Sequence, residues 1–133
     1  MSPPGYIFFL KEMIVMPTDI ISRSIHNELQ YLKLNPKYKG YQYLYEMIEG
    51  IVNHKVGLSG PFISKEVYDY VKPKKPSSHT EIRNLCNNAI IRAYKNNEKL
   101  YAEYFKFPTR PSTYDVMITV VNVVVRKRYL KHI

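Results

Sequence analysis

The sequence has little cysteine, no tryptophan and no long apolar run. Its single cysteine, Cys86, excludes an internal disulfide framework and any metal site built from several cysteines, and it is typical of a reducing cytoplasm. The longest apolar runs reach about ten residues, half of what a membrane-spanning helix needs. The opening residues, MSPPGYIFFLKEMIV, have no basic region before the apolar stretch, and Lys11 and Glu12 interrupt it. We therefore expect a cytoplasmic protein without a signal peptide.

The charge of the chain is unevenly distributed. Twenty Lys and Arg residues against eleven Asp and Glu leave a net charge of +9. Residues 1–60 hold six basic and five acidic side chains, whereas residues 61–133 hold fourteen and six. This excess favours a polyanionic partner, either nucleic acid or an anionic membrane surface, bound by the second half of the chain. No segment pairs a Lys/Arg face with a large aromatic face, which argues against the membrane surface.

The composition is that of one globular domain. Of 133 residues, 45% are hydrophobic and 23% are charged. Thirteen tyrosines could contact phosphates or bases, but we expect most of them to fill the core and its rim. We assign residues 1–17 to an N-terminal extension, which the pattern leaves open between helix and strand, and residues 18–133 to the domain.

Apolar residues recur at helical spacing through most of the domain, and turn residues separate the segments. The first segment follows Thr18 as a helix cap and stops at Asn35-Pro36, because a residue before proline is disfavoured in a helix. A capping box, Ser78-x-x-Glu81, opens the fourth segment. The expected helices are 18 to about 34, 41–52, 63–71, 79–95, 98–106 and 113–130. The predicted class is all-α, with about six helices.

The last of these segments is ambiguous from the residues alone. Residues 116–125, VMITVVNVVV, are β-branched and apolar on all sides, which by propensity favours a strand. The length of the segment instead favours a buried helix, and Arg126, Lys127 and Arg128 near its end would suit the negative end of a helix dipole. We expect a helix.

A short helix, a turn and a longer capped helix over residues 63–95 have the outline of a helix-turn-helix. In that motif the exposed side chains of the second helix meet base edges in the major groove, and residues before it hold phosphates. The candidate base-reading residues are Arg83, Asn84, Asn87 and Asn88. The candidate phosphate contacts are Lys74, Lys75, Ser77, Ser78, Thr80 and Lys95. The alternative interpretation is a solvated polar helix face beside a basic loop.

Enzymatic interpretations find little support in the residues. The four histidines lack metal-ligand spacing, and Cys86 lies on an apolar stripe, where a buried thiol is inert. Gly57, Gly60 and Lys65 do not form a phosphate-binding loop, because the glycine spacing differs and no Gly-Lys-Ser/Thr follows. We expect neither an enzyme nor a metal or other cofactor.

Several segments resemble one family. These are KGYQYLYEMI at 39–48, SKEVYDY at 64–70, SSHTEIRNLCNNAIIRAYKNN at 77–97 and the Pro-Ser/Thr-x-x-acidic pattern from Pro111 to Asp115. Together they resemble the C-terminal DNA-binding effector domain of the stage-zero sporulation response regulator of endospore-forming bacteria. The resemblance covers about residues 18–131. It implies an all-α domain of six helices, which also favours helix for the valine-rich segment.

The resemblance also implies a function. Members of this family bind short boxes of double-stranded DNA as tandem protomers and contact the sigma subunit of RNA polymerase. The family's recognition helix is rich in Arg and has a His at the position of Asn88 and a basic residue at the position of Glu81. Since Arg and Asn prefer different bases, the DNA box of this chain need not be the family's. The chain has no room for the family's phospho-receiver domain, so we expect an effector domain without its receiver.

Two hypotheses of different classes follow. The first is a sequence-specific DNA-binding transcription regulator. The second is a protein-interaction module that binds the polymerase sigma subunit or a full-length paralogue without reading DNA. The reduced number of recognition arginines and the apolar Ile91 on the outward arc favour the second. DNA binding should need the basic residues 72–75 and 126–131, whereas an apolar interface should not.

Overall fold

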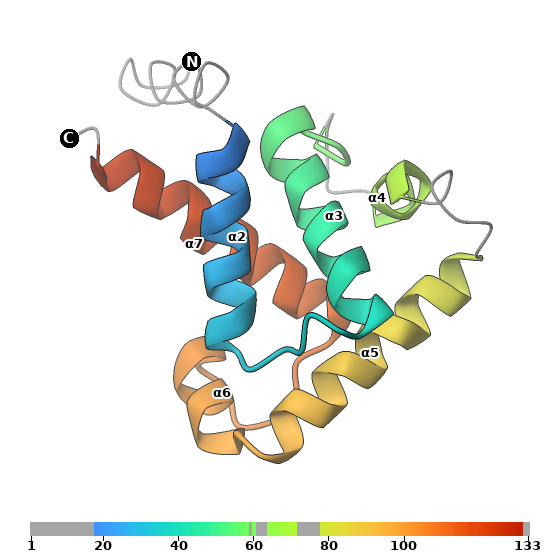
Figure 1. Cartoon of the computed structure of the whole chain (residues 1–133), viewed down its shortest axis with the longest axis vertical. Coiled ribbons are helices and arrows are strands. Elements are labelled where there is room, and N and C mark those ends of the chain that lie inside the picture. Colours follow the sequence, from blue (N-terminus) through green and yellow to red (C-terminus); the bar gives the residue numbers. More distant parts are fainter. Residues whose placement is uncertain (1–17, 59, 61–63, 72–77, 132–133) are drawn as a thin grey trace.

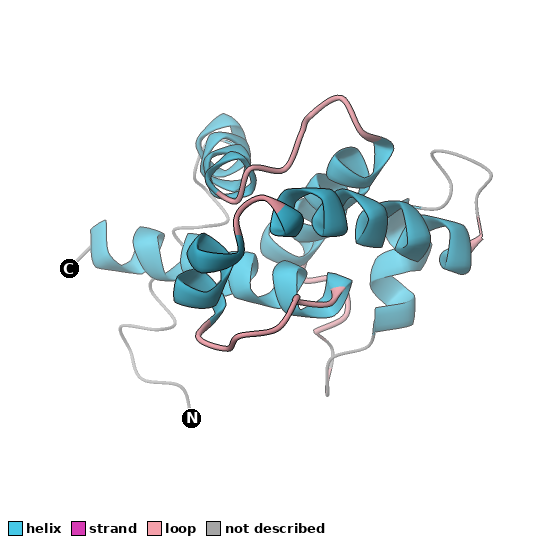
Figure 2. Ribbon diagram, turned by 90° about the horizontal axis from the view of Figure 1, so that it is seen from below, coloured by secondary structure: helices cyan, strands magenta, loops and turns pink. Residues whose placement is uncertain are grey.

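The computed structural model describes residues 18–58, 60, 64–71 and 78–131. Within these ranges the chain forms six α-helices and no strand, which confirms the predicted all-α class (Figures 1 and 2). The helices are α2 (Thr18–Tyr31), α3 (Lys39–His54), α4 (Ser64–Val71), α5 (His79–Lys95), α6 (Glu98–Phe105) and α7 (Thr113–Lys131). None of the helices in the described ranges has the length and hydropathy of a membrane span. The predicted extension, residues 1–17, lies outside the described residues.

Helix α3 is the centre of the fold. It packs against α2, α4, α5 and α7, and α7 also contacts α2 and α5. In Figure 1, α3 runs between α2 on one side and α4 and α5 on the other, while the short α6 lies below α2 at the lower end of the molecule. The α3 side chains that face these neighbours are largely apolar and buried, among them Tyr41, Leu44, Met47, Ile48 and Ile51. One core therefore joins all the helices.

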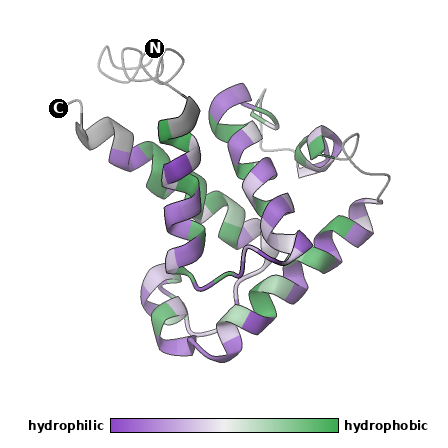
Figure 3. Ribbon diagram, viewed as in Figure 1, coloured by the Kyte–Doolittle hydropathy of each residue, from purple (hydrophilic) through white to green (hydrophobic). Residues whose placement is uncertain are grey.

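The valine-rich segment is the helix α7. Val116, Val120 and Val124 are fully buried at steps of four, the spacing of one helix face. Figure 3 shows α7 as hydrophobic over most of its coloured length, whereas hydrophilic and hydrophobic bands alternate along α5. Burial against α2, α3 and α5 on several sides explains why α7 lacks a polar face. Tertiary packing here overrides the strand propensity of valine.

Three helices end in a left-handed residue that is lysine rather than glycine. These residues are Lys33, Lys55 and Lys106, with φ of 63°, 53° and 66°. After α2, the Lys33 N–H donates to the Gln30 carbonyl at 2.9 Å and the Leu34 N–H to the Leu29 carbonyl at 3.2 Å, as in a Schellman motif. Helix α2 consequently ends at Tyr31, earlier than the predicted stop at Asn35-Pro36.

A buried carboxylate joins three helices. Glu28 of α2, only 6% exposed, accepts the Lys127 ammonium of α7 at 2.6 Å and the Tyr104 hydroxyl of α6 at 3.1 Å. Beside it the Tyr101 hydroxyl donates to the carbonyl of Leu32 at 2.7 Å. Removing one partner would leave a buried polar group unpaired, which costs more than the hydrogen bond itself contributes. These contacts fix α6 and α7 against the end of α2.

The closest helix crossing lies where α3 begins. Gly40 packs on α5 so tightly that a Cβ atom there would overlap the Leu85 carbonyl oxygen and meet the Ala89 Cβ at 3.0 Å. The Cys86 thiol donates to the Gly40 carbonyl at 3.7 Å, and Cys86 is fully buried, as the sequence predicted. Burial raises the pKa of this thiol to about 12. Small residues on both helices permit the approach.

Gly40→Ala should therefore destabilise the domain by about 1–3 kcal/mol, because overpacking outweighs the better helix propensity of alanine. Gly60→Ala is the matched control, because a Cβ atom there would meet nothing within 4 Å. Denaturant unfolding of both variants measures the difference. Equal stability of the two variants would show that the crossing is not tightly packed.

The buried tyrosines make stability sensitive to alkali. Burial raises the pKa of Tyr101, and burial together with Glu28 raises that of Tyr104. Because the folded state favours the neutral phenols, stability is complete below about pH 10, the pKa of unfolded tyrosine, and falls as pH rises above it. Denaturant unfolding between pH 8 and pH 12 measures this fall, and absorbance at 295 nm reports phenolate formation. A free energy of unfolding that stays constant to pH 12 would contradict it.

Candidate nucleic-acid interface

Helices α4 and α5 form the part of the fold that the sequence assigned to a helix-turn-helix. In Figure 1, α4 is seen end-on while α5 lies along the page, so the two helices cross steeply. Val67 and Val71 of α4 and Ile82 of α5 are fully buried in the shared core. The connecting residues 72–77 lie outside the described residues, and with them the candidate phosphate contacts Lys74, Lys75 and Ser77.

Side chains at the start of α5 hold it to α4. The His79 Nε2 atom lies 2.6 Å from the Asp69 carboxylate, whose pKa is lowered chiefly by this hydrogen bond and further by Lys65. The His79 ring also lies against Tyr68, with 5.7 Å between ring centroids. The guanidinium carbon of Arg83 stands 6.0 Å from the centroid of the same Tyr68 ring. Tyr68 thus positions both the N-terminus of α5 and its first arginine.

The predicted capping interaction is present at the N-terminus of α5. The Ser78 Oγ atom accepts the Glu81 N–H at 3.1 Å, and the same hydroxyl lies 3.2 Å from the Glu81 carboxylate, to which it donates. Glu81 therefore acts as a capping partner, and the proton of the Ser78 hydroxyl is directed to Glu81 rather than to solvent. Any phosphate at this end would have to compete with that contact.

One face of α5 is largely exposed and polar. Turning 100° per residue, the exposed side chains of Thr80, Asn84, Asn88 and Lys95 fall within a single arc. Arg83 is also exposed and borders this arc on the side of α4. The structure thus brings together three of the four predicted base-reading residues. Ile91, in the same arc, is half-buried rather than fully outward.

Asn87 is placed differently from the other predicted base readers. It is half-buried, and its Oδ1 atom accepts the hydroxyl proton of Thr113 at 2.6 Å. Thr113 is only 3% exposed at the start of α7. Asn87 therefore joins α5 to α7, and because the two residues are far apart in sequence, no local pattern could have revealed the contact.

Arg92 is an exposed residue of this face that the sequence analysis missed. Its guanidinium donates to the Tyr38 hydroxyl at 3.2 Å and lies 5.0 Å from the centroid of that ring. Arg92 follows Asn88 by four residues, so helical spacing alone could have identified it. With Arg83 and Lys95 it gives α5 three exposed cations against one carboxylate, Glu81.

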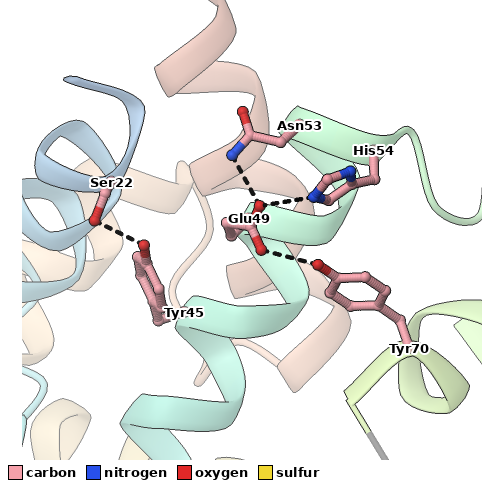
Figure 4. Close-up of polar contacts among 6 residues, drawn as sticks. All are labelled: Ser22, Tyr45, Glu49, Asn53, His54 and Tyr70. Atoms are coloured by element: carbon pink, nitrogen blue, oxygen red, sulfur yellow. Dashed lines mark hydrogen bonds and ion pairs between the residues drawn. The ribbon is translucent and has the colours of Figure 1, made fainter. Parts of the chain in front are cut away.

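A second polar cluster lies between α3 and α4, and its carboxylate, Glu49, has three side-chain partners (Figure 4). The Glu49 carboxylate accepts the Tyr70 hydroxyl at 3.0 Å and the Asn53 amide at 2.8 Å, and it lies 3.3 Å from the His54 Nε2 atom. Burial and Glu49 raise the pKa of Tyr70 to about 12. Gly50 makes room for this ring, since a Cβ atom there would meet it at 2.7 Å. The cluster holds α4 against α3.

A groove of about 510 Å³ between α2 and α3 contains His26. The His26 ring stacks on Tyr45 with 4.2 Å between centroids, and its Nδ1 atom lies 2.7 Å from the Tyr41 hydroxyl. Burial lowers the pKa of His26, so the ring is neutral near pH 7. Among the described residues that line the groove there is no carboxylate to orient the imidazole.

No metal-binding cluster of three or more His, Cys, Asp or Glu side chains occurs in the part of the chain that the structure describes. Comparison with known proteins assigns no relationship: no protein family, curated protein or solved structure matches the chain. The function has to be inferred from the residues themselves.

Asn87 has a structural contact, whereas Asn84 and Asn88 are exposed, so their substitutions should differ in effect on stability. Asn87→Ala leaves the buried Thr113 hydroxyl without its acceptor and should cost about 1–3 kcal/mol of stability. Asn84→Ala and Asn88→Ala alter exposed side chains and should change stability by less than about 0.5 kcal/mol. Denaturant unfolding of the three variants compares them. Similar values for all three would contradict the assigned role of Asn87.

Proposed function

We propose that the chain is a sequence-specific DNA-binding transcription regulator that places α5 in the major groove. The observation that carries this proposal is the exposed face of α5, which combines amide and guanidinium side chains with a net positive charge. Arg pairs with guanine and Asn with adenine through two hydrogen bonds each, so Arg83, Asn84 and Asn88 have the chemistry of base reading. The proposal assigns no catalytic activity to the chain.

The position of α4 supports this proposal. In a helix-turn-helix the first helix braces the recognition helix, and here Tyr68 and Asp69 of α4 contact the first turns of α5. Arg83 lies over the Tyr68 ring, which limits the conformations of the guanidinium before it meets a base. Less side-chain freedom then remains to be lost on binding.

Phosphate contacts complete the proposed interface. Thr80 and Lys95 are exposed near opposite ends of α5, where they would lie at the two edges of the major groove. Ser78 would contribute only after releasing Glu81. Lys74, Lys75 and Ser77 remain predictions from the sequence. The resemblance to the sporulation effector domain supports the same function, and binding of tandem protomers to DNA and contact with the polymerase sigma subunit belong to this proposal.

The rival proposal, a protein-interaction module that does not read DNA, finds less support. It needs an exposed apolar surface, and Ile91 is half-buried. The large hydrophobic side chains exposed among the described residues are Tyr31, Tyr38, Leu58 and Tyr114. They come from four different segments, and Tyr38 is engaged with Arg92.

Selection of bound duplexes from a random DNA pool tests the proposed function. We expect one preferred box, and binding that weakens steeply with salt. If the protein neutralises about four to six phosphates, log affinity plotted against log salt should have a slope near −4 to −5. Absence of binding at low salt, or a slope near zero, would refute DNA binding.

The same assay tests which side chains read bases. Asn84→Ala and Asn88→Ala should weaken binding to the selected box by about 1–3 kcal/mol and leave binding to random duplexes unchanged. Asn27→Ala is the matched control, because Asn27 is an exposed asparagine on α2. Equal losses on selected and random DNA would show that α5 reads no base through these residues.

A further inference from the structure

A small basic pocket lies at the opposite end of α5 from its cap. Its volume is about 220 Å³, more than a phosphate group occupies. The C-terminal half of α5 forms one wall and the connection between α2 and α3 forms the other. Its polar lining residues are Lys33, Asn35, Tyr38, Arg92, Asn96 and Asn97.

The charge of this pocket has one sign. Two lining residues are cationic, Lys33 and Arg92, and none is acidic. Among the described residues, no carboxylate forms an ion pair with either cation. The negative end of the α5 dipole lies close by and opposes an anion. Lys33 and Arg92 carry a full positive charge each, against about half an elementary negative charge at the helix end, and charge-assisted hydrogen bonds are roughly twice as strong as neutral ones.

Contacts within the protein position the Arg92 and Asn35 donors of the pocket before a ligand binds. Tyr38 fixes Arg92 through its ring and its hydroxyl. The Asn35 Oδ1 atom accepts the Lys37 N–H at 2.9 Å, so the Asn35 amide group remains as a donor. Lys33 has a left-handed backbone conformation two residues after the end of α2, which sets the direction in which its side chain leaves the backbone. Such a set of donors suits an oxyanion with several acceptor oxygens.

The length of α5 relates this pocket to DNA. Its seventeen residues span about 25 Å, twice the width of the major groove, about 12 Å. With its first turns in the groove, the C-terminal end reaches past the bases. Arg92 is exposed and falls about 40° beyond Asn88 around the helix, so the pocket opens at the flank of the base-reading arc, where the sugar–phosphate backbone lies. We propose that the pocket between Lys33 and Arg92 binds a phosphate oxyanion and anchors one backbone phosphate beside the groove. The DNA part of this inference rests on the proposed function.

Two variants and one matched control test the inference on DNA. Lys33→Gly removes one pocket cation and also relaxes the left-handed backbone, so the fold is retained. Arg92→Gln removes the other at an exposed site. Lys55→Gly makes the same change of charge and backbone at the far end of α3. Each pocket variant should weaken binding to selected and random duplexes by the same factor and reduce the salt slope by about 0.9, whereas Lys55→Gly should not.

Titration with inorganic phosphate tests the pocket without DNA. In amide NMR spectra, we expect saturable shifts at Lys33, Asn96 and Asn97 that are lost in Arg92→Gln and kept in Lys55→Gly. If phosphate binds but the DNA slopes do not change, the site takes a free phosphate and the backbone anchor is wrong. If phosphate binds and DNA does not, the proposed function fails and the oxyanion site stands.

The remaining outcomes overturn the inference. If DNA binds while neither pocket variant changes the slope and phosphate causes no shift, the pocket is not an oxyanion site, although the proposed function survives. Equal slope changes in Lys33→Gly and Lys55→Gly would show that only the overall charge matters. Absence of both DNA and phosphate binding would refute both proposals.

Discussion

The crossing of α3 and α5 at Gly40 is the contact on which the rest of the structure depends. Because Gly40 has no side chain, the backbone of α3 lies against the Leu85 carbonyl, and Cys86 and Ala89 close the remaining space. Dense packing of this kind leaves little room to rotate either helix. With Cys86 and Ala89 turned inward, helix geometry directs Thr80, Asn84 and Asn88 to solvent. The exposed face of α5 is thus a consequence of a contact on its buried side.

The same crossing positions both ends of the proposed interface. It places Tyr38, the residue before α3, beside Arg92, which aligns the α2–α3 connection with the C-terminal half of α5. At the other end, α4 packs on α3 through the Glu49 cluster (Figure 4). Helix α4 also holds α5 through Tyr68. A tyrosine ring therefore orients an arginine at each end of α5: Tyr68 holds Arg83, and Tyr38 holds Arg92. Both arginines gain rigidity from residues outside α5.

Local sequence signals predicted the helices well and the site only in part. The Ser78-x-x-Glu81 pattern identified the cap of α5, because capping depends on residues three apart. Spacing at 100° per residue identified Arg83, Asn84 and Asn88 as exposed. It could not show that Asn87 accepts the hydroxyl proton of Thr113 or that Tyr38 holds Arg92, since residues 26 and 54 positions apart meet only through tertiary packing. The pocket between Lys33 and Arg92 depends on the same tertiary packing and therefore could not be predicted from the sequence.

The three lysines in the left-handed conformation each keep a positive charge at a position where glycine would be more stable. A non-glycine residue in this conformation costs about 1–2 kcal/mol, whereas a cation near a helix C-terminus contributes about 0.3–1 kcal/mol. Glycine would therefore be the more stable residue at Lys33, Lys55 and Lys106. Departures from a local rule without a stabilising gain are expected where function needs the side chain. Lys33 lines a basic pocket together with Arg92, and the phosphate that we propose there would use the retained charge.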